Sequence, residues 1–284
     1  MASLSWNVRV LILVAVAAIS LAGLFLFAPV VPQDQASHNL ADQRTLLDLP
    51  NFWNVASNVP FFLIGILGLR VSGPLTQRVF FFSIFLVGFG SSYYHWAPSD
   101  PPLTWDRLPI TLGFMAIFAN LVEERVSEKA GRALLMPLLA LGIISVVVWR
   151  MTDDLRLYGW VVFFPILVLP VLFWLFPPKY TGTANWFIAA GLYGASKLTE
   201  VLDWPIMSLG GVVSGHTLKH LFVAAAAYVL YRNFATRRPL SAGFRSSPTL
   251  KSAGSARRER PASHRRLWRS ASPSSAAAGR CLPR

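Results

Sequence analysis

The sequence predicts an all-α integral membrane protein, a bundle of seven transmembrane helices with an additional N-terminal transmembrane helix. Hydrophobic residues make up 54% of the 284-residue chain and charged residues only 14%, whereas an ordinary soluble domain carries roughly 25% charged residues. Eight apolar runs have lengths that suit a helical span, which requires ~17–25 residues. These runs cover residues 7–28, 52–71, 78–97, 107–122, 132–149, 157–176, 184–201 and 212–232.

Residues 1–29 contain the first run and are expected to form a transmembrane helix or signal anchor. A signal peptide would also begin with a short basic segment, but no small-x-small cleavage site precedes Pro29, which favours an uncleaved helix. Residues 30–50 are polar and acidic and are expected to form a non-cytoplasmic loop. The seven remaining runs lie within residues 51–235, and their short connections should keep neighbouring helices adjacent in space.

The loops between the runs differ in charge on the two sides of the membrane. Lys and Arg gather on one side, at Arg78, Arg125, Lys129, Arg132, Lys179, Arg232, Arg237 and Arg238. The other side carries mainly Asp, at Asp34, Asp42, Asp48, Asp100, Asp153, Asp154 and Asp203. Because an excess of Lys and Arg marks the cytoplasmic side, eight spans place both termini in the cytoplasm.

The C-terminal stretch, residues 236–284, is expected to be a basic, disordered cytoplasmic tail. It holds twelve of the 26 Lys and Arg residues and is rich in Ser, Ala and Pro without periodicity. It is either simply solvated or attracted to anionic lipid headgroups. Nucleic-acid binding is not expected of a tail tethered to this bundle. The single cysteine, Cys281, excludes an internal disulfide and a cysteine-based metal site.

Histidines are the residues around which the predicted bundle is organised. His216 and His220 lie four residues apart in GHTLKH, at the start of the last run, and therefore share one helix face. His95 lies near the end of the run 78–97, on the same non-cytoplasmic side. Imidazoles inside a bilayer are costly without a partner, and a divalent metal ion is a partner that uses all three.

Two further residues complete a candidate catalytic site. Ser91 lies four residues before His95, one helical turn deeper on the same face. Asp106, in TWDRLP, opens the next run and is held near His95 by the short loop SDPP. Three histidine ligands leave the fourth zinc position for water, and zinc lowers the pKa of that water to about 7. A nearby carboxylate can orient or deprotonate it.

Each of these residues also has a simpler explanation. Asp106 precedes Pro109 at a predicted helix start and could serve only as an N-cap. Ser91 could hydrogen bond to a carbonyl of its own helix, or pack between helices beside Gly88 and Gly90. A histidine near the membrane interface is more often a satisfied polar residue than a ligand. The shared depth of all five site residues favours the metal site.

At this point the motifs resemble a known family. GFGSSYYH, DRLP eleven residues after its histidine, and GHTLKH are similar to motifs of the alkaline ceramidase family, which includes alkaline phytoceramidase. That family belongs to a superfamily of seven-helix membrane hydrolases and receptors. NFWNVASN also resembles the family's EFWN-x-x-SN segment. The resemblance extends from about Asn51 to Arg232.

The resemblance implies a zinc-dependent intramembrane amidohydrolase. It would cleave the N-acyl bond of ceramide-like lipids, releasing a sphingoid base and a fatty acid. Zinc would be bound by His95, His216 and His220, while Asp106 would position or deprotonate the water. Ser91 would contact that water or the oxyanion. The protein would reside in a bacterial inner membrane or in the endoplasmic reticulum or Golgi of a eukaryote, with its site toward the non-cytoplasmic leaflet.

The sequence departs from the family in two respects. Animal and yeast-type members have an acidic N-terminal segment and a glutamate before FWN that are linked to calcium binding. Asn51 stands at that glutamate's position and the acidic residues 34–48 do not clearly align, which weighs against calcium as a second metal. The additional N-terminal helix indicates a divergent branch, whose lipid need not be ceramide itself.

Other polar residues of the bundle leave alternatives open. Lys197 and Glu200, three residues apart, would pair with each other or contact the polar head of a substrate. Lys219 is expected to face away from the histidines that flank it. Two other functions remain: a receptor-like or scaffold protein with a structural zinc, and a metal transporter. A transporter would need ligands at several depths, whereas the histidines of this bundle lie in one layer.

Overall fold

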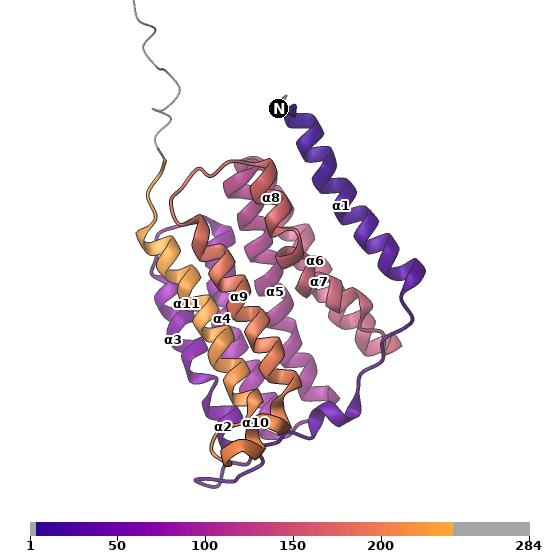
Figure 1. Cartoon of the computed structure of the whole chain (residues 1–284), viewed down its shortest axis with the longest axis vertical. Helices are drawn as coiled ribbons and strands as arrows, with labels where there is room; N and C mark the ends of the chain where they lie inside the picture. The colour runs from indigo at the N-terminus through magenta and orange to yellow at the C-terminus, as the bar shows by residue number, and fades with distance from the viewer. Residues whose placement is uncertain (1–3, 241–284) are drawn as a thin grey trace, which may run out of the picture. The chain divides into compact units, whose positions relative to one another are not determined.

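The computed structural model describes residues 4–240, and these residues form an all-α membrane protein (Figure 1). The predicted all-α membrane class is therefore confirmed, whereas the predicted number of membrane-spanning helices stays a prediction. The helices within this range are α1 (Trp6–Phe27), η1 (Gln35–His38, a 3₁₀ helix), α2 (Phe52–Ala56), α3 (Val59–Leu69), α4 (Leu75–Trp96), α5 (Asp100–Arg125), α6 (Glu128–Thr152), α7 (Arg156–Leu167), α8 (Leu169–Leu175), α9 (Thr183–Val201), α10 (Asp203–Gly210) and α11 (Gly215–Thr236).

Five helical segments of the described chain are long and apolar enough to cross a membrane. They are Trp6–Phe27, Phe52–Leu69, Leu75–Trp96, Glu128–Thr152 and Arg156–Leu175, where α2 continues into α3 and α7 into α8. The long helices α5, α9 and α11 match the other three predicted runs but are not among these five. Their membrane crossing stays a prediction, supported by their place within the same bundle (Figure 1).

Close helix packing is made possible by small residues that face neighbouring helices. A Cβ atom added to Gly65 of α3 would lie 2.7 Å from the backbone nitrogen of Phe85 in α4. One turn further on, a Cβ on Gly68 would overlap the ring of Phe81, which is only 1% exposed. Because α3 and α4 meet through glycines, the buried aromatic rings of α4 can fill the space beside the α3 backbone.

Residues 29–50, here named the N-terminal belt, run across the end of the bundle at which α2 and α10 lie (Figure 1). The belt is fixed by backbone and side-chain hydrogen bonds to several helices rather than by helix packing of its own. The contacts are Leu155 N to Val31 O (2.8 Å), Ala41 N to Asp203 Oδ2 (2.9 Å), Asn54 Nδ2 to Asp42 O (2.9 Å) and His38 Nδ1 to Tyr94 Oη (2.9 Å).

An ion pair stabilises the middle of the belt. Asp42 is fully buried and accepts hydrogen bonds from the Arg44 guanidinium at 2.5 and 2.8 Å. This contact lowers the pKa of the Asp42 carboxyl below its ordinary value. Arg44 also donates to the carbonyls of Gly211 and Val212, in the loop before α11. The belt therefore holds the loop from which the last helix begins.

The C-terminal end of the described chain pairs with the segment between α8 and α9. Tyr180 forms an isolated bridge with Pro239, and the Arg237 guanidinium pairs with Glu124 of α5. Most of the predicted basic tail, from residue 241 onward, lies outside the described residues, as does Cys281.

We expect Gly65→Ala to destabilise the bundle, because the new methyl group would meet the α4 backbone, which cannot move aside as a side chain tip could. Overpacking of this kind costs about 1–3 kcal/mol. The matched control is Gly194→Ala in α9, where a Cβ meets no atom of residues 4–240 within 4 Å. Thermal unfolding in detergent should show a lower Tm for Gly65→Ala only, and an unchanged Tm would refute the α3–α4 contact.

Candidate active site

The three predicted histidines come together in the structure, from α4 and α11. The Nε2 atom of His95 lies 3.2 Å from His220 Nε2 and 3.3 Å from His216 Nε2. All three side chains are buried, with exposed fractions of 1%, 7% and 4% for His95, His216 and His220. Their nearest ligand atoms all lie within 4.8 Å of one another, so the cluster could bind a metal ion.

The geometry of this cluster fits a metal better than hydrogen bonds between imidazoles. Each neutral imidazole has one N–H and one lone pair, so His95 Nε2 cannot form two ordinary hydrogen bonds of opposite sense. Tetrahedral zinc with Zn–N bonds of about 2.0–2.1 Å separates its nitrogen ligands by about 3.3 Å. The two distances from His95 Nε2 agree with that separation.

A hydrogen-bond chain determines which nitrogen of His220 is free to bind a metal. The Ser57 hydroxyl donates its proton to the Asn54 carbonyl (3.1 Å) and lies 2.7 Å from His220 Nδ1. Because the serine proton is used in this way, Nδ1 of His220 carries the proton of the second hydrogen bond and donates to Ser57. His220 Nε2 then presents its lone pair to the other two histidines, as a metal ligand requires.

The start of α11 is fixed by contacts that place both of its histidines. Ser214 caps the helix by accepting from Thr217 N (3.0 Å), and Asp203 Oδ1 accepts from His216 N (2.7 Å). A Cβ atom on Gly215 would overlap the carbonyl oxygen of Thr199 in α9. Only glycine therefore allows α11 to begin this close to α9 and to the capping carboxylate.

Asp106 lies in the second turn of α5, because this helix begins at Asp100 and Ser99 is its N-cap residue. The alternative in which Asp106 serves only as an N-cap is therefore wrong. A Cβ on Gly90 would overlap Trp105 O and lie 3.1 Å from Asp106 Cα, so glycine lets α5 approach α4 at this level. Asp106 Oδ1 is buried and has no hydrogen-bond partner within residues 4–240.

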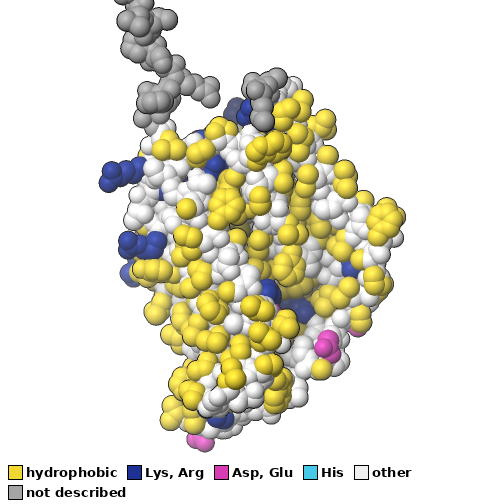
Figure 2. Space-filling model, viewed as in Figure 1, with side chains coloured by type: hydrophobic (Ala, Val, Ile, Leu, Met, Phe, Trp, Pro, Cys, Tyr) yellow, Lys and Arg dark blue, Asp and Glu magenta, His cyan; other side chains and the backbone are white. Residues whose placement is uncertain are grey.

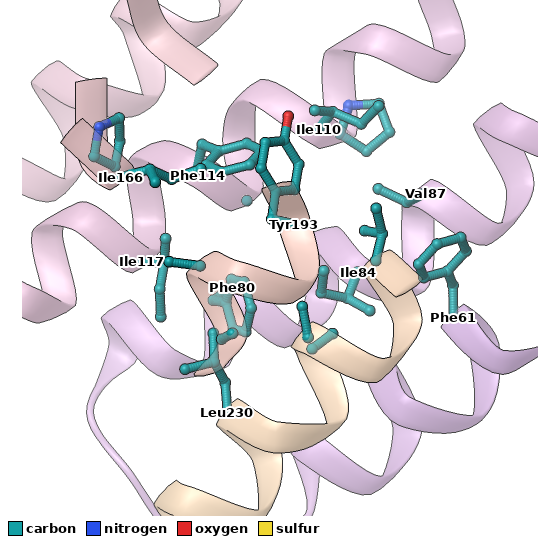
Figure 3. Close-up of a pocket in the computed structure, with 18 of the residues that line it drawn as sticks. Phe61, Phe80, Ile84, Val87, Ile110, Phe114, Ile117, Ile166, Tyr193 and Leu230 are labelled. Carbon is teal, nitrogen blue, oxygen red and sulfur yellow. The ribbon is translucent and has the colours of Figure 1, made fainter. Parts of the chain in front are cut away.

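A cavity of about 280 Å³ extends from this site between α4, α5, α7, α9 and α11. Ser91, Asp106 and His220 line it at one end, with Lys197, Glu200 and Lys219 beside them. Arg107 and Tyr158 also line it, most of the remaining wall is apolar, and Figure 3 shows apolar side chains around one space. The labelled residues are Phe61, Phe80, Ile84, Val87, Ile110, Phe114, Ile117, Ile166, Tyr193 and Leu230.

The cavity is bounded toward α7 by aromatic side chains rather than by close helix packing. The Tyr193 ring of α9 contacts Phe114 of α5, with ring centroids 5.1 Å apart, and Phe163 of α7, at 6.2 Å. The face seen in Figure 2 is largely apolar, with a few basic side chains within it.

The ceramidase family model matches residues 49–178 of the chain. This match supports assignment of the chain to the alkaline ceramidase family. Ceramidases are hydrolases that act on the amide bond of ceramide, a membrane lipid. The match includes Ser91, His95 and Asp106, and it ends before the helix that carries His216 and His220. No curated protein matches the chain.

The structure adds residues whose part in the site the sequence did not reveal. Ser57 and Asp203 hold His220 and the start of α11, and the Asn51 amide donates to the His95 carbonyl (2.9 Å). The prediction that Lys219 faces away is wrong, since its side chain lines the cavity and pairs with Glu200 (2.5 Å). A polar side chain near the start of the first core span was the only available signal for Ser57.

We expect Ser57→Ala to weaken zinc binding about 10- to 100-fold, as loss of a hydrogen bond to a ligating histidine commonly does. Zinc affinity would be measured by competition with a chelator in detergent. The control is Ser83→Ala, because the buried Ser83 hydroxyl donates to Val79 O in its own helix. Equal affinity in the Ser57 variant and in wild type would exclude Ser57 as a support of the ligand.

Proposed function

We propose that the chain is a zinc-dependent intramembrane amidohydrolase that cleaves the N-acyl bond of ceramide-type lipids to a sphingoid base and a fatty acid. In this proposal His95, His216 and His220 hold the metal, and Asp106 and Ser91 are catalytic. The observation that carries it is the convergence of three buried histidines, of which His220 lines a largely apolar cavity of about 280 Å³ together with Asp106, a buried residue whose Oδ1 has no hydrogen-bond partner within residues 4–240.

Zinc bound by the three histidines would supply a Lewis acid and make water acidic enough to react near pH 7. Asp106 removes a proton from the attacking water, whose oxygen forms the new bond to the amide carbon. The carbon–nitrogen bond then breaks, and Asp106 returns the proton to the leaving amine. The buried, unpartnered Oδ1 of Asp106 suits this exchange, because its hydrogen-bonding capacity within residues 4–240 is unused.

Ser91 is proposed to contact the reacting oxygen atoms. Its side chain is 3% exposed and lines the same end of the cavity as Asp106. It lies one helical turn before His95, so the hydroxyl and the imidazole project from the same face of α4. A hydroxyl in this position can hold the attacking water or donate a hydrogen bond to the oxyanion that forms on the carbonyl.

The apolar part of the cavity is proposed to hold the acyl chain. His220, Val223, Ala227 and Leu230 follow one face of α11, and all four line the cavity. The ten helical steps from His220 to Leu230 correspond to about 15 Å of helix. An acyl chain lying along this face would bring its amide to the polar end, where the histidines and Asp106 are located.

The first test is zinc content together with fatty-acid release from a ceramide in detergent micelles. We expect about one zinc per wild-type chain, and loss of both zinc and activity in His216→Ala. Asp106→Asn should keep zinc and reduce turnover about 10²- to 10⁴-fold, because it removes the proton acceptor while conserving shape.

Two results would contradict the proposal in different ways. Wild-type turnover in Asp106→Asn would exclude Asp106 as the base. Folded wild type that takes up no zinc, even when zinc is supplied, would exclude the metal-dependent mechanism. Zinc retained without hydrolysis by wild type would instead favour the receptor-like or scaffold alternative.

A further inference from the structure

The polar end of the cavity contains a charged cluster that the hydrolysis does not use. Glu200 accepts from Lys197 Nζ at 2.8 Å through Oε2 and from Lys219 Nζ at 2.5 Å through Oε1. One carboxylate thus pairs with two ammonium groups, and all three side chains line the cavity. The Lys197–Glu200 pair expected from the sequence is present, but Lys219 makes the cluster cationic.

Arg107 adds a third cation on the wall contributed by α5. Its guanidinium stacks 4.0 Å from the Trp149 ring centroid and 4.8 Å from that of Tyr158. Its Nη2 donates to Gln33 Oε1 of the N-terminal belt (2.5 Å), and Gln33 N donates to Asp153 Oδ1 (3.0 Å). Arg107 Nη1 is buried with no hydrogen-bond partner among the described residues.

The charges that line this cavity do not cancel. Among the described residues its wall carries three cations, Arg107, Lys197 and Lys219, and two carboxylates, Asp106 and Glu200. An excess cation within a membrane protein is costly, and a buried guanidinium nitrogen without an acceptor adds a further cost. Both costs would be removed by a ligand that supplies one negative charge and several acceptor oxygens.

We propose that the amine half of the substrate carries an acidic group, phosphate or carboxylate, which Arg107, Lys197 and Lys219 bind. This inference rests on the proposed amidohydrolase function. Arg107 directly follows Asp106 on α5 and Lys219 directly precedes His220 on α11, so the cations are next to the reacting groups. The acyl chain occupies the apolar part of the cavity, and the charged wall is therefore left for the head group.

An acidic group suits these three residues chemically. A guanidinium matches phosphate and carboxylate oxygens geometrically, and each ammonium supplies a further charged donor. The stacking of Arg107 on two aromatic rings and its contact with Gln33 hold the guanidinium in one orientation, so little side-chain freedom is lost on binding. A neutral head group would leave the excess charge uncompensated.

The test compares matched lipids that differ only in the acidic group. One pair is a ceramide and the ceramide 1-phosphate with the same chains, and the other is N-palmitoylethanolamine and N-palmitoylglycine. We expect kcat/KM for the acidic member of at least one pair to exceed that of its neutral partner by about tenfold or more, as one charged hydrogen bond provides.

The ratio of kcat/KM for the acidic lipid to kcat/KM for its neutral partner should fall about tenfold, toward one, in Arg107→Gln and in Lys197→Gln. The matched control is Arg150→Gln, because Arg150 lies 5.5 Å from the Trp149 ring centroid but is exposed and is not part of the cavity wall. Zinc content of about one per chain would confirm that each variant is folded. Inhibition by palmitate is measured in parallel for wild type and both variants. It shows whether the cations bind the acidic head group of the substrate or the carboxylate of the released fatty acid.

The outcomes separate this inference from the proposed function. Hydrolysis of the neutral lipids alone, or a preference that both variants leave unchanged, would overturn the inference and leave the amidohydrolase intact. Relief of palmitate inhibition in the variants without any change in substrate preference would also overturn it, by assigning the cations to the product. Hydrolysis of none of the four lipids by zinc-loaded wild type would instead contradict the proposed function.

Discussion

The constraint on which this structure depends is that polar side chains within a membrane bundle must find their partners inside the protein. The three histidines meet one another, Ser57 meets His220, and Glu200 meets two lysines. Ser57 follows α2, whereas the histidines, Glu200 and the lysines are carried by α4, α9 and α11, and four of them, His220, Lys197, Glu200 and Lys219, line the cavity. Because the polar side chains are paired inside the bundle, the outer faces of these helices can be apolar. The site and the membrane-facing surface thus both follow from this pairing.

The N-terminal belt extends this principle to the end of the bundle. Its His38 contacts Tyr94, the neighbour of His95, and its Gln33 holds Arg107, the neighbour of Asp106. The belt backbone at Ala41 donates to Asp203, the residue that also caps α11 before its histidines. In each case the belt contacts a residue that is next in sequence, or hydrogen bonded, to a proposed site residue. The belt therefore orients the site from outside without supplying a ligand to it.

Much of this arrangement could be predicted from sequence, because periodicity and spacing are local properties. The helical runs agree with the observed helices within a few residues, except that α5 begins at Asp100 rather than near residue 107. Pro101 and Pro102 lie in the first turn of α5, where proline is compatible with a helix. In the sequence they suggested a loop, so this extension of the helix was not predicted. The histidine cluster was predictable because charge asymmetry placed its members at one depth.

The residues that could not be predicted depend on contacts between distant segments. Ser57 reaches His220 because α2 ends at Ala56 and α3 restarts at Val59, a break that the apolar pattern of residues 52–71 does not show. Lys219 lies between two histidines in sequence, and helical spacing alone directs it elsewhere. It lines the cavity because Glu200, on the neighbouring helix α9, draws its ammonium group to that side. Where a cationic side chain has a partner across a helix interface, the partner determines its direction.

The division of the cavity into a charged wall and an apolar wall determines how a lipid can lie in it. An acyl chain placed against the lysines would bury charges without partners, and an acidic head group placed among Ile84, Ile117 and Leu230 would lose its solvation without compensation. The proposed direction of the lipid avoids both costs, and in that direction its amide would lie between the two walls. His220, Ser91 and Asp106 line the cavity there. Recognition of the two ends of the lipid would thus position the bond between them.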